Sequence, residues 1–89
     1  MKHAMNFLAR IQISLKPSVL DPQGAAVTKA LGALGFDEVR DVRVGRYLEA
    51  RLTAPDEEAA RQRVTAMCDA LLANLIIERY EFTLVGEAP

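Results

Sequence analysis

The stretch that decides the fold is DVRVGRYLEARLT, residues 41–53. Its apolar side chains stand at alternate positions: Val42, Val44, Leu48, Ala50 and Leu52. A period of two is typical of a strand that buries one face. A two-residue hairpin at residues 45–46 would bring the charged side chains after it onto the apolar face, which the pattern disfavours.

Two interpretations of Gly45 remain open. A three-residue turn over residues 45–47 would keep the alternation, and so would one strand that is bent or bulged at the glycine. We favour the single strand. From residue 42 to residue 53 it would run about 36 Å at about 3.3 Å per residue, which is longer than a small domain can cover. Part of it should therefore contact something outside its own fold.

The sequence before this stretch predicts a strand followed by a helix. Apolar and polar side chains alternate over residues 6–16, which indicates a strand with one buried side. Helical spacing of apolar side chains predicts a helix over residues 23–34. Gly35 follows the last turn and is expected to end the helix.

The sequence after it predicts a helix and a last strand. The helix should begin with Pro55 in its first position and end at Asn74 in a left-handed conformation. The strand should run over residues 77–85. We therefore expect a single domain over residues 1–89 of the α+β class, a two-layer sandwich in the order β-α-β-α-β. Both helices would cover one face of a small antiparallel sheet, whose second strand is long and bent.

Composition excludes several classes of partner. The formal net charge is −1 and no run of lysine and arginine exists, which argues against nucleic-acid binding. No apolar run approaches the roughly 20 residues that span a bilayer, and the N-terminus does not resemble a signal peptide. Cys68 is the single cysteine, so no internal disulfide can form and a cytoplasmic location is expected.

Residues that could support catalysis are scarce. His3 is the single histidine, and it stands near the terminus. Cys68 follows Met67 within an apolar helical stripe, where a buried, unreactive thiol is expected. No phosphate loop, metal-ligand cluster or Ser-His-Asp set is visible. The sequence therefore indicates a non-catalytic module.

The connection KPSVLDPQG, residues 16–24, contains one feature that local structure does not explain. Asp21 followed by proline predicts a helix N-cap and a first-position proline. Gly24 costs up to about 1 kcal/mol in a helix relative to alanine. We expect another backbone or a partner to approach it, beside Lys16 and Gln23. If a partner does so, leucine at position 24 should preserve the fold and block docking.

Three stretches together resemble the PurS family, the small subunits of phosphoribosylformylglycinamidine synthase in de novo purine biosynthesis. They are LKPSVLDPQGAAV (residues 15–27), VRVGRYLEARL (residues 42–52) and MCDALLANLIIERYEF (residues 67–82). The resemblance covers nearly the whole chain.

The resemblance implies a division of labour in a glutamine-dependent C–N ligase. A PurL-type synthetase subunit binds ATP, Mg²⁺ and formylglycinamide ribonucleotide, and a PurQ-type glutaminase subunit produces ammonia. The PurS-type subunit, a homodimer or dimer of dimers with no cofactor or active site of its own, assembles them. The candidate interface residues are Lys16, Asp21, Gln23, Gly24, Gly45, Arg46, Asn74 and Glu78.

The alternative is a free-standing ACT-like regulatory module that binds a small molecule. Such domains are also small α+β sandwiches that dimerise, and they bind an amino acid at a glycine-containing loop. VLDPQG, residues 19–24, could serve as that loop. The order of elements and the LLAN run, residues 71–74, favour PurS.

Overall fold

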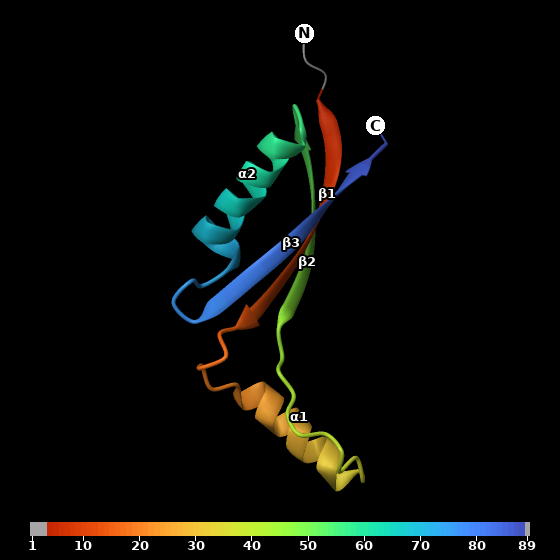
Figure 1. The fold of residues 1–89 in the computed structure, drawn as a ribbon, viewed down its shortest axis with the longest axis vertical. Coiled ribbons are helices and arrows are strands. Elements are labelled where there is room, and N and C mark those ends of the chain that lie inside the picture. The colour runs from red at the N-terminus through yellow and green to blue at the C-terminus, as the bar shows by residue number, and fades with distance from the viewer. Residues whose placement is uncertain (1–3, 89) are drawn as a thin grey trace.

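The computed structural model describes residues 4–88. Its elements are β1 (Met5–Leu15), α1 (Pro22–Ala33), β2 (Arg46–Ala54), α2 (Glu57–Met67), the π-helical turn η1 (Cys68–Leu72) and β3 (Glu78–Glu87). The strands form one antiparallel sheet in the order β2-β1-β3 (Figure 1). The α+β class, the order of elements and the antiparallel sheet are therefore confirmed.

The sheet has one apolar face, and β1 lies at its centre. The alternation expected along β1 is confirmed, since four of its side chains on one face are buried: Phe7, Ala9, Ile11 and Ile13. α2 and η1 cover this face and bury Ala60, Val64 and Cys68 against it. The opposite face has polar side chains, including ion pairs across the strands.

The second strand is shorter than predicted. β2 begins at Arg46 and pairs with β1 along its whole length, so no tight turn forms over residues 45–47. Residues 42–45 are extended but lie outside the sheet, where they run back beside α1 (Figure 1). Alternation alone could not separate these two cases, because an extended segment packed on a helix can alternate like a strand. Gly45 marks the point where the chain joins the sheet.

The structure places α2 on the apolar face but not α1, contrary to the arrangement expected from the sequence. α1 lies beyond the end of the sheet (Figure 1), and Gly24 is its one buried residue. The width of the sheet explains this difference. Three strands spaced about 4.8 Å apart span about 10 Å between the outer strand axes, and one helix of about 10 Å diameter fills that face.

The ends of the helices agree with the sequence at some positions and differ at others. Gly35 has a φ of 96°, and Phe36 N donates to Leu31 O at 3.0 Å, so α1 ends as expected in a glycine-based Schellman motif. Pro55 precedes the N-cap Asp56 and is not the first helical residue. The left-handed ending expected at Asn74 is wrong, because no described residue other than glycine has a positive φ.

The chain is extended for its length. Its radius of gyration is 17.4 Å and its dimensions are 60 × 28 × 14 Å. A compact chain of this length has a radius of gyration of about 12 Å. The excess comes from residues 16–45, which project from the sheet and are called the arm below (Figure 1).

Candidate docking surfaces

The described residues offer little for catalysis. No group of three or more histidine, cysteine, aspartate or glutamate side chains among residues 4–88 could hold a metal ion. Cys68 is fully buried, and burial followed by the charge of Asp69 raises the pKa of its thiol. His3 lies outside the described residues. None of the described helices has the length and apolar character needed to cross a membrane.

A hollow on the polar face of the sheet could hold a small ligand by its shape, but its lining is chemically unselective. Its volume is about 390 Å³, and its polar lining mixes both charges: Arg10, Gln12, Tyr47, Glu81 and Thr83. In the described part of the chain, every buried side-chain nitrogen and oxygen already has a hydrogen-bond partner. No buried polar side chain of the described residues is therefore left without a partner and available to recognise a ligand.

The base of the arm is held together by the carboxylate of Asp21. Its Oδ1 accepts a hydrogen bond from Gly24 N at 2.9 Å, and its Oδ2 accepts one from Val44 N at 2.8 Å. These two bonds, the Gly24 bond first, lower the pKa of Asp21. One side chain thus caps α1, as the sequence predicts, and also ties the returning segment to the helix.

Gly24 is explained by the same return of the chain. A Cβ at position 24 would overlap the carbonyl oxygen of Val42. The close approach expected from the sequence therefore comes from the chain's own backbone. The expectation that leucine at this position preserves the fold is wrong, because any side chain would push residue 42 away.

Arg43 completes the base of the arm. Its Nη2 donates to the carbonyl oxygens of Lys16 and Val19, at 3.0 Å each. The connection KPSVLDPQG is therefore tied at both of its ends to residues 43–44. These bonds hold the connection in place and so fix the direction of the arm. Gln23 stays exposed on the first turn of α1.

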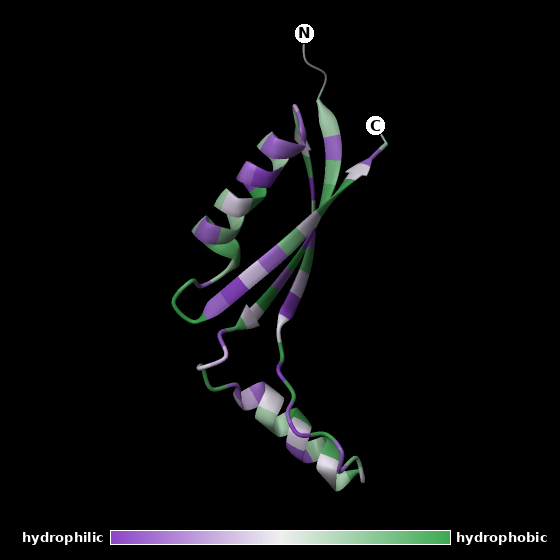
Figure 2. Cartoon of the chain, viewed as in Figure 1, coloured by the Kyte–Doolittle hydropathy of each residue, from purple (hydrophilic) through white to green (hydrophobic). Residues whose placement is uncertain are grey.

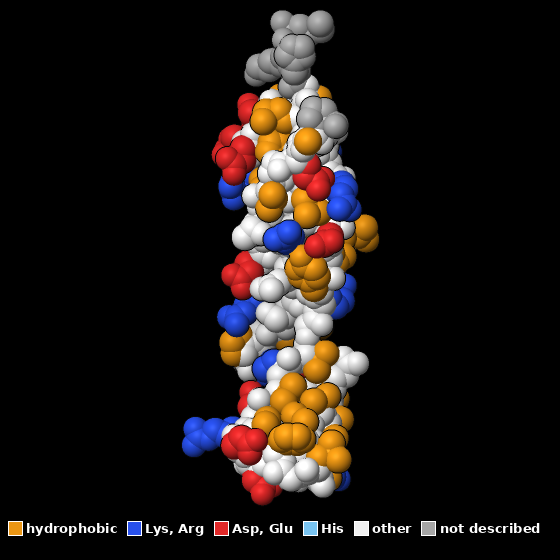
Figure 3. Space-filling model, turned by 90° about the vertical axis from the view of Figure 1, so that its right-hand side faces the viewer, with side chains coloured by type: hydrophobic (Ala, Val, Ile, Leu, Met, Phe, Trp, Pro, Cys, Tyr) orange, Lys and Arg blue, Asp and Glu red, His pale blue; other side chains and the backbone are white. Residues whose placement is uncertain are grey.

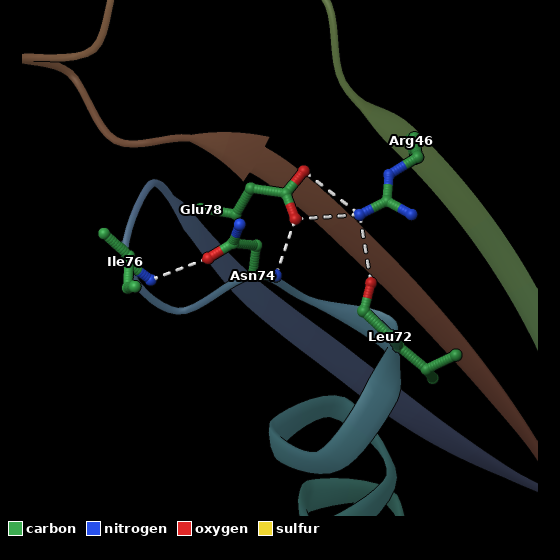
Figure 4. A network of polar contacts seen from close by, with 5 residues as sticks. All are labelled: Arg46, Leu72, Asn74, Ile76 and Glu78. Atoms are coloured by element: carbon green, nitrogen blue, oxygen red, sulfur yellow. Dashed lines mark hydrogen bonds and ion pairs between the residues drawn. The ribbon is translucent and has the colours of Figure 1, made fainter.

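A second polar network lies at the same end of the sheet. Arg46 Nη2 donates to Leu72 O at 3.0 Å and pairs with both carboxylate oxygens of Glu78, at 2.9 and 3.0 Å (Figure 4). Glu78 Oε1 also accepts from Asn74 N at 2.7 Å, and this bond is the main cause of the lowered pKa of Glu78. Three of the candidate residues chosen from sequence thus form one cluster.

This cluster shapes the segment before β3. We call residues 71–77, which end η1 and lead into β3, the tip loop. Asn74 Oδ1 accepts from Ile76 N at 3.1 Å, and Asn74 O accepts from Ile77 N at 3.1 Å, so the loop is tightly turned (Figure 4). Ile77 O in turn accepts from Lys16 N at 2.9 Å, which joins the tip loop to the base of the arm.

Two sets of large apolar side chains remain uncovered. The tip loop exposes Leu71, Leu75, Ile76 and Ile77. The arm exposes Leu20, Val27, Leu34 and Phe36. Figure 3 shows hydrophobic side chains gathered over the end of the molecule where α1 lies. Singly exposed apolar residues are ordinary, but such groups mark interaction surfaces.

Neither apolar set was predicted from the sequence. The helix over residues 23–34 was expected to pack on the sheet, and the interface candidates in the tip region were Asn74 and Glu78. The signal for the tip loop was present as LIIE, residues 75–78, an apolar run directly after a predicted helix end. A short apolar run beside a turn is also compatible with a buried strand, so its exposure could not be predicted from the sequence alone.

Comparison with known proteins identifies the family. The model of the PurS family, described as phosphoribosylformylglycinamidine (FGAM) synthase, matches residues 8–86. The chain belongs to the PurS family. The resemblance seen in the sequence is thereby confirmed. The match supports PurS rather than the ACT-like alternative.

Individual PurS relatives support the assignment. The PurS subunit of phosphoribosylformylglycinamidine synthase from a Synechocystis strain is 50% identical over 81 residues, covering 91% of this chain and 81% of the relative. The Bacillus subtilis subunit is 43% identical over 76 residues, covering 85% and 89%. The family match over residues 8–86 includes both the connection at residues 16–24 and the tip loop.

Solved PurS structures share the fold. The B. subtilis PurS structure superposes with a TM-score of 0.81 at 40% identity, covering 89% of this chain and 98% of that chain. A chain in the structure of PurLQS from Thermotoga maritima gives a TM-score of 0.84 at 26% identity, covering 90% and 98%. The open arrangement of sheet and arm is therefore close to that of known PurS chains.

Proposed function

We propose that this chain is a non-catalytic assembly subunit of phosphoribosylformylglycinamidine synthase. It forms a single PurS-like domain that bridges a PurL-type synthetase and a PurQ-type glutaminase. The partner synthetase binds ATP and Mg²⁺ and converts formylglycinamide ribonucleotide to the amidine with ammonia released from glutamine. The work takes place in the cytoplasm, with the other enzymes of purine biosynthesis.

The observation that carries this proposal is that the PurS fold of this chain exposes groups of large apolar side chains but buries its one cysteine. Among the described residues, the one cysteine is buried, while eight large apolar side chains are exposed in two groups. A surface of this kind favours binding of other proteins. A T. maritima relative occurs in a structure named PurLQS, which is a precedent for assembly with PurL and PurQ.

The test is a reconstitution with two nitrogen sources. The synthetase and glutaminase subunits are purified and assayed with glutamine or with ammonium, each with and without this chain. If the chain assembles the complex, omitting it should abolish turnover with glutamine and leave turnover with ammonium. Full glutamine-dependent activity without the chain, or turnover by the chain alone, would contradict the proposal.

The partner set includes a second copy of this chain, as a homodimer or a dimer of dimers. The arm supports this part of the proposal, because its apolar side chains are exposed and the chain is far more extended than a compact domain. A small domain with little buried surface gains stability by association. Sedimentation velocity should show a dimer at concentrations on the order of tens of micromolar. A monomer under these conditions would contradict it.

A further inference from the structure

The chain crosses between the sheet and the arm twice, after β1 and before β2, and hydrogen bonds hold both crossings (Figure 1). After β1, Lys16 N donates to Ile77 O at 2.9 Å, and Lys16 O accepts from Arg43 Nη2 at 3.0 Å. Before β2, Val44 N donates to Asp21 Oδ2 at 2.8 Å. The two crossings are therefore tied to each other, and the arm leaves the sheet in one direction.

Gly45 is the tightest point of the second crossing. A Cβ at this position would stand 2.5 Å from the carbonyl oxygen of Ile13 and 3.5 Å from the Cα of Ser14. The φ of Gly45 is not positive, so the close contact, and not the backbone conformation, explains the glycine. Alanine needs a contact distance of 3.4 Å or more, so residues 13 and 45 would have to separate by about 1 Å.

Packing of the core does not explain why the arm is held so firmly. Gly24 is the one buried residue of α1, so this helix adds little to the core beneath α2. Ordering an arm costs conformational entropy, which core burial does not offset here. Even so, the one buried charged side chain of the described residues, Asp21, holds the arm to its own base. What the molecule gains from these contacts is a constant angle between the arm and the sheet.

We propose that Gly45 and Arg43 are positioning residues for the glutamine-dependent reaction, because they set this angle. The inference rests on the proposed function, since an assembly subunit can fix where its partners lie only if its own parts keep one geometry. α1 is about 18 Å long, so a small rotation at the crossings moves the far end of the arm by more than it moves the crossings. Ammonia must pass from the glutaminase to the synthetase before it escapes, and a displaced arm should therefore uncouple their reactions.

The test counts the glutamate that the reconstituted complex releases for each ATP that it hydrolyses. With the unaltered chain the two amounts should match. With Gly45→Ala at a concentration that saturates the complex, this ratio should rise about twofold or more and the maximal glutamine-dependent rate should fall about tenfold. Turnover with ammonium should not change. The circular dichroism of the variant should stay the same, because residue 45 is exposed and lies outside every helix and strand.

Two controls separate position from stability. Gly32→Ala adds the same methyl group to the arm at a place where nothing lies within 4 Å, and it should keep both the ratio and the rate. Ile11→Val loosens the core of the sheet and should lower the melting temperature. It should still keep the ratio, because a less stable chain forms fewer complexes without changing the geometry of those that form.

A second pair of variants loosens the crossings without adding bulk. Arg43→Met removes the bonds to the carbonyl oxygens of Lys16 and Val19 and should also raise the ratio. Arg43→Lys can still donate to these oxygens and should restore much of the coupling. Arg40→Met alters another exposed arginine of the arm and should have no effect. These variants decide the matter if Gly45→Ala fails to fold.

The outcomes distinguish this inference from the proposed function. An unaltered ratio in folded Gly45→Ala or in Arg43→Met would overturn the positioning role, and so would an equal rise in Ile11→Val. Glutamine-dependent turnover that does not need the chain at all would instead overturn the proposed assembly function.

Discussion

The two helices begin alike and end in different surroundings. Each follows an aspartate whose carboxylate accepts a hydrogen bond three residues on, Asp21 from Gly24 N at 2.9 Å and Asp56 from Ala59 N at 2.8 Å. Their lengths are 12 and 11 residues. Local signals therefore form both helices equally well, and the difference between them lies in what covers them.

The more apolar helix is the more exposed one. α1 has a single charged side chain, Lys29, whereas α2 has four: Glu57, Glu58, Arg61 and Arg63. Even so, α2 packs on the sheet, and the apolar positions of α1 seen in Figure 2 have no strand over them. An apolar stripe therefore predicts that a helix will be covered by another surface. The stripe does not specify whether that surface belongs to the same chain or to another molecule.

The largest effect should come from the core beneath α2. Ile11→Ala removes a fully buried side chain at the centre of the sheet and should cost about 2–5 kcal/mol in the free energy of unfolding. The matched change in the arm, Leu20→Ala, affects a side chain that is 81% exposed and should stay within about 0.5 kcal/mol. Urea unfolding of dilute protein measures both. Equal losses would mean that the arm belongs to the core.

The next effect distinguishes two glycines of α1. Gly24→Ala places a methyl group against Val42 O and should destabilise the chain by about 1–3 kcal/mol, as overpacking does. At Gly32 nothing lies within 4 Å of the added Cβ, so Gly32→Ala should stabilise the helix by about 0.5–1 kcal/mol. Thermal melts of the pair test the sign. Stabilisation by both alanines would refute the close approach at Gly24.

A smaller effect compares the two N-caps. Asp56→Ala removes a cap and should cost about 1 kcal/mol. Asp21→Ala should cost more, because the same carboxylate also accepts the bond from Val44 N. Hydrogen exchange resolves the cause: the amide of Val44 should lose protection in Asp21→Ala and keep it in Asp56→Ala. Equal protection in both variants would show that Asp21 acts on the helix alone.

The smallest effect concerns pH at the tip loop. The folded-state pKa of Glu78 is lowered, mainly by the bond from Asn74 N and then by Arg46. A lowered pKa means that the stabilisation is complete above the unfolded value near 4.5 and is lost as pH falls through the folded value. Arg46→Gln should raise this pKa without restoring it to the ordinary range, because the Asn74 bond remains. A carboxyl titration by NMR measures the change, and an unaltered pKa would remove Arg46 from the cluster.

The sequence predicted what depends on near neighbours. Alternation along β1 identified its buried face, and the Asp21-Pro22 pair identified the start of α1, because both follow from backbone geometry over a few residues. Arg46, Asn74 and Glu78 were predicted separately as interface candidates. Their cluster could not be foreseen, since Arg46 and Glu78 are 32 positions apart and no local rule joins them.

Prediction from the sequence failed where one hydrophobic pattern was compatible with two different packing partners. Residues 42–45 alternate because they are extended, and the pattern is the same whether a strand or a helix lies beside them. Likewise, the spacing in α1 shows an apolar side without specifying the sheet of the same chain or another molecule. The position of α1 is decided by the width of the sheet, because one helix, α2, already fills its apolar face.

The central position of β1 affects how the chain can fold during synthesis. Met5 pairs with Ala54, and Leu15 pairs with Glu78, so β1, which is synthesised before the other two strands, waits for partners encoded much later. At about 5–20 residues per second, the interval between residues 15 and 78 is roughly 3 to 13 seconds. Such distant pairings also slow folding itself. Until β2 is synthesised the nascent strand carries an apolar face and two unpaired edges, and the edge that receives β3 stays unpaired for the whole interval. Such a segment is a suitable substrate for chaperones that bind extended apolar chains.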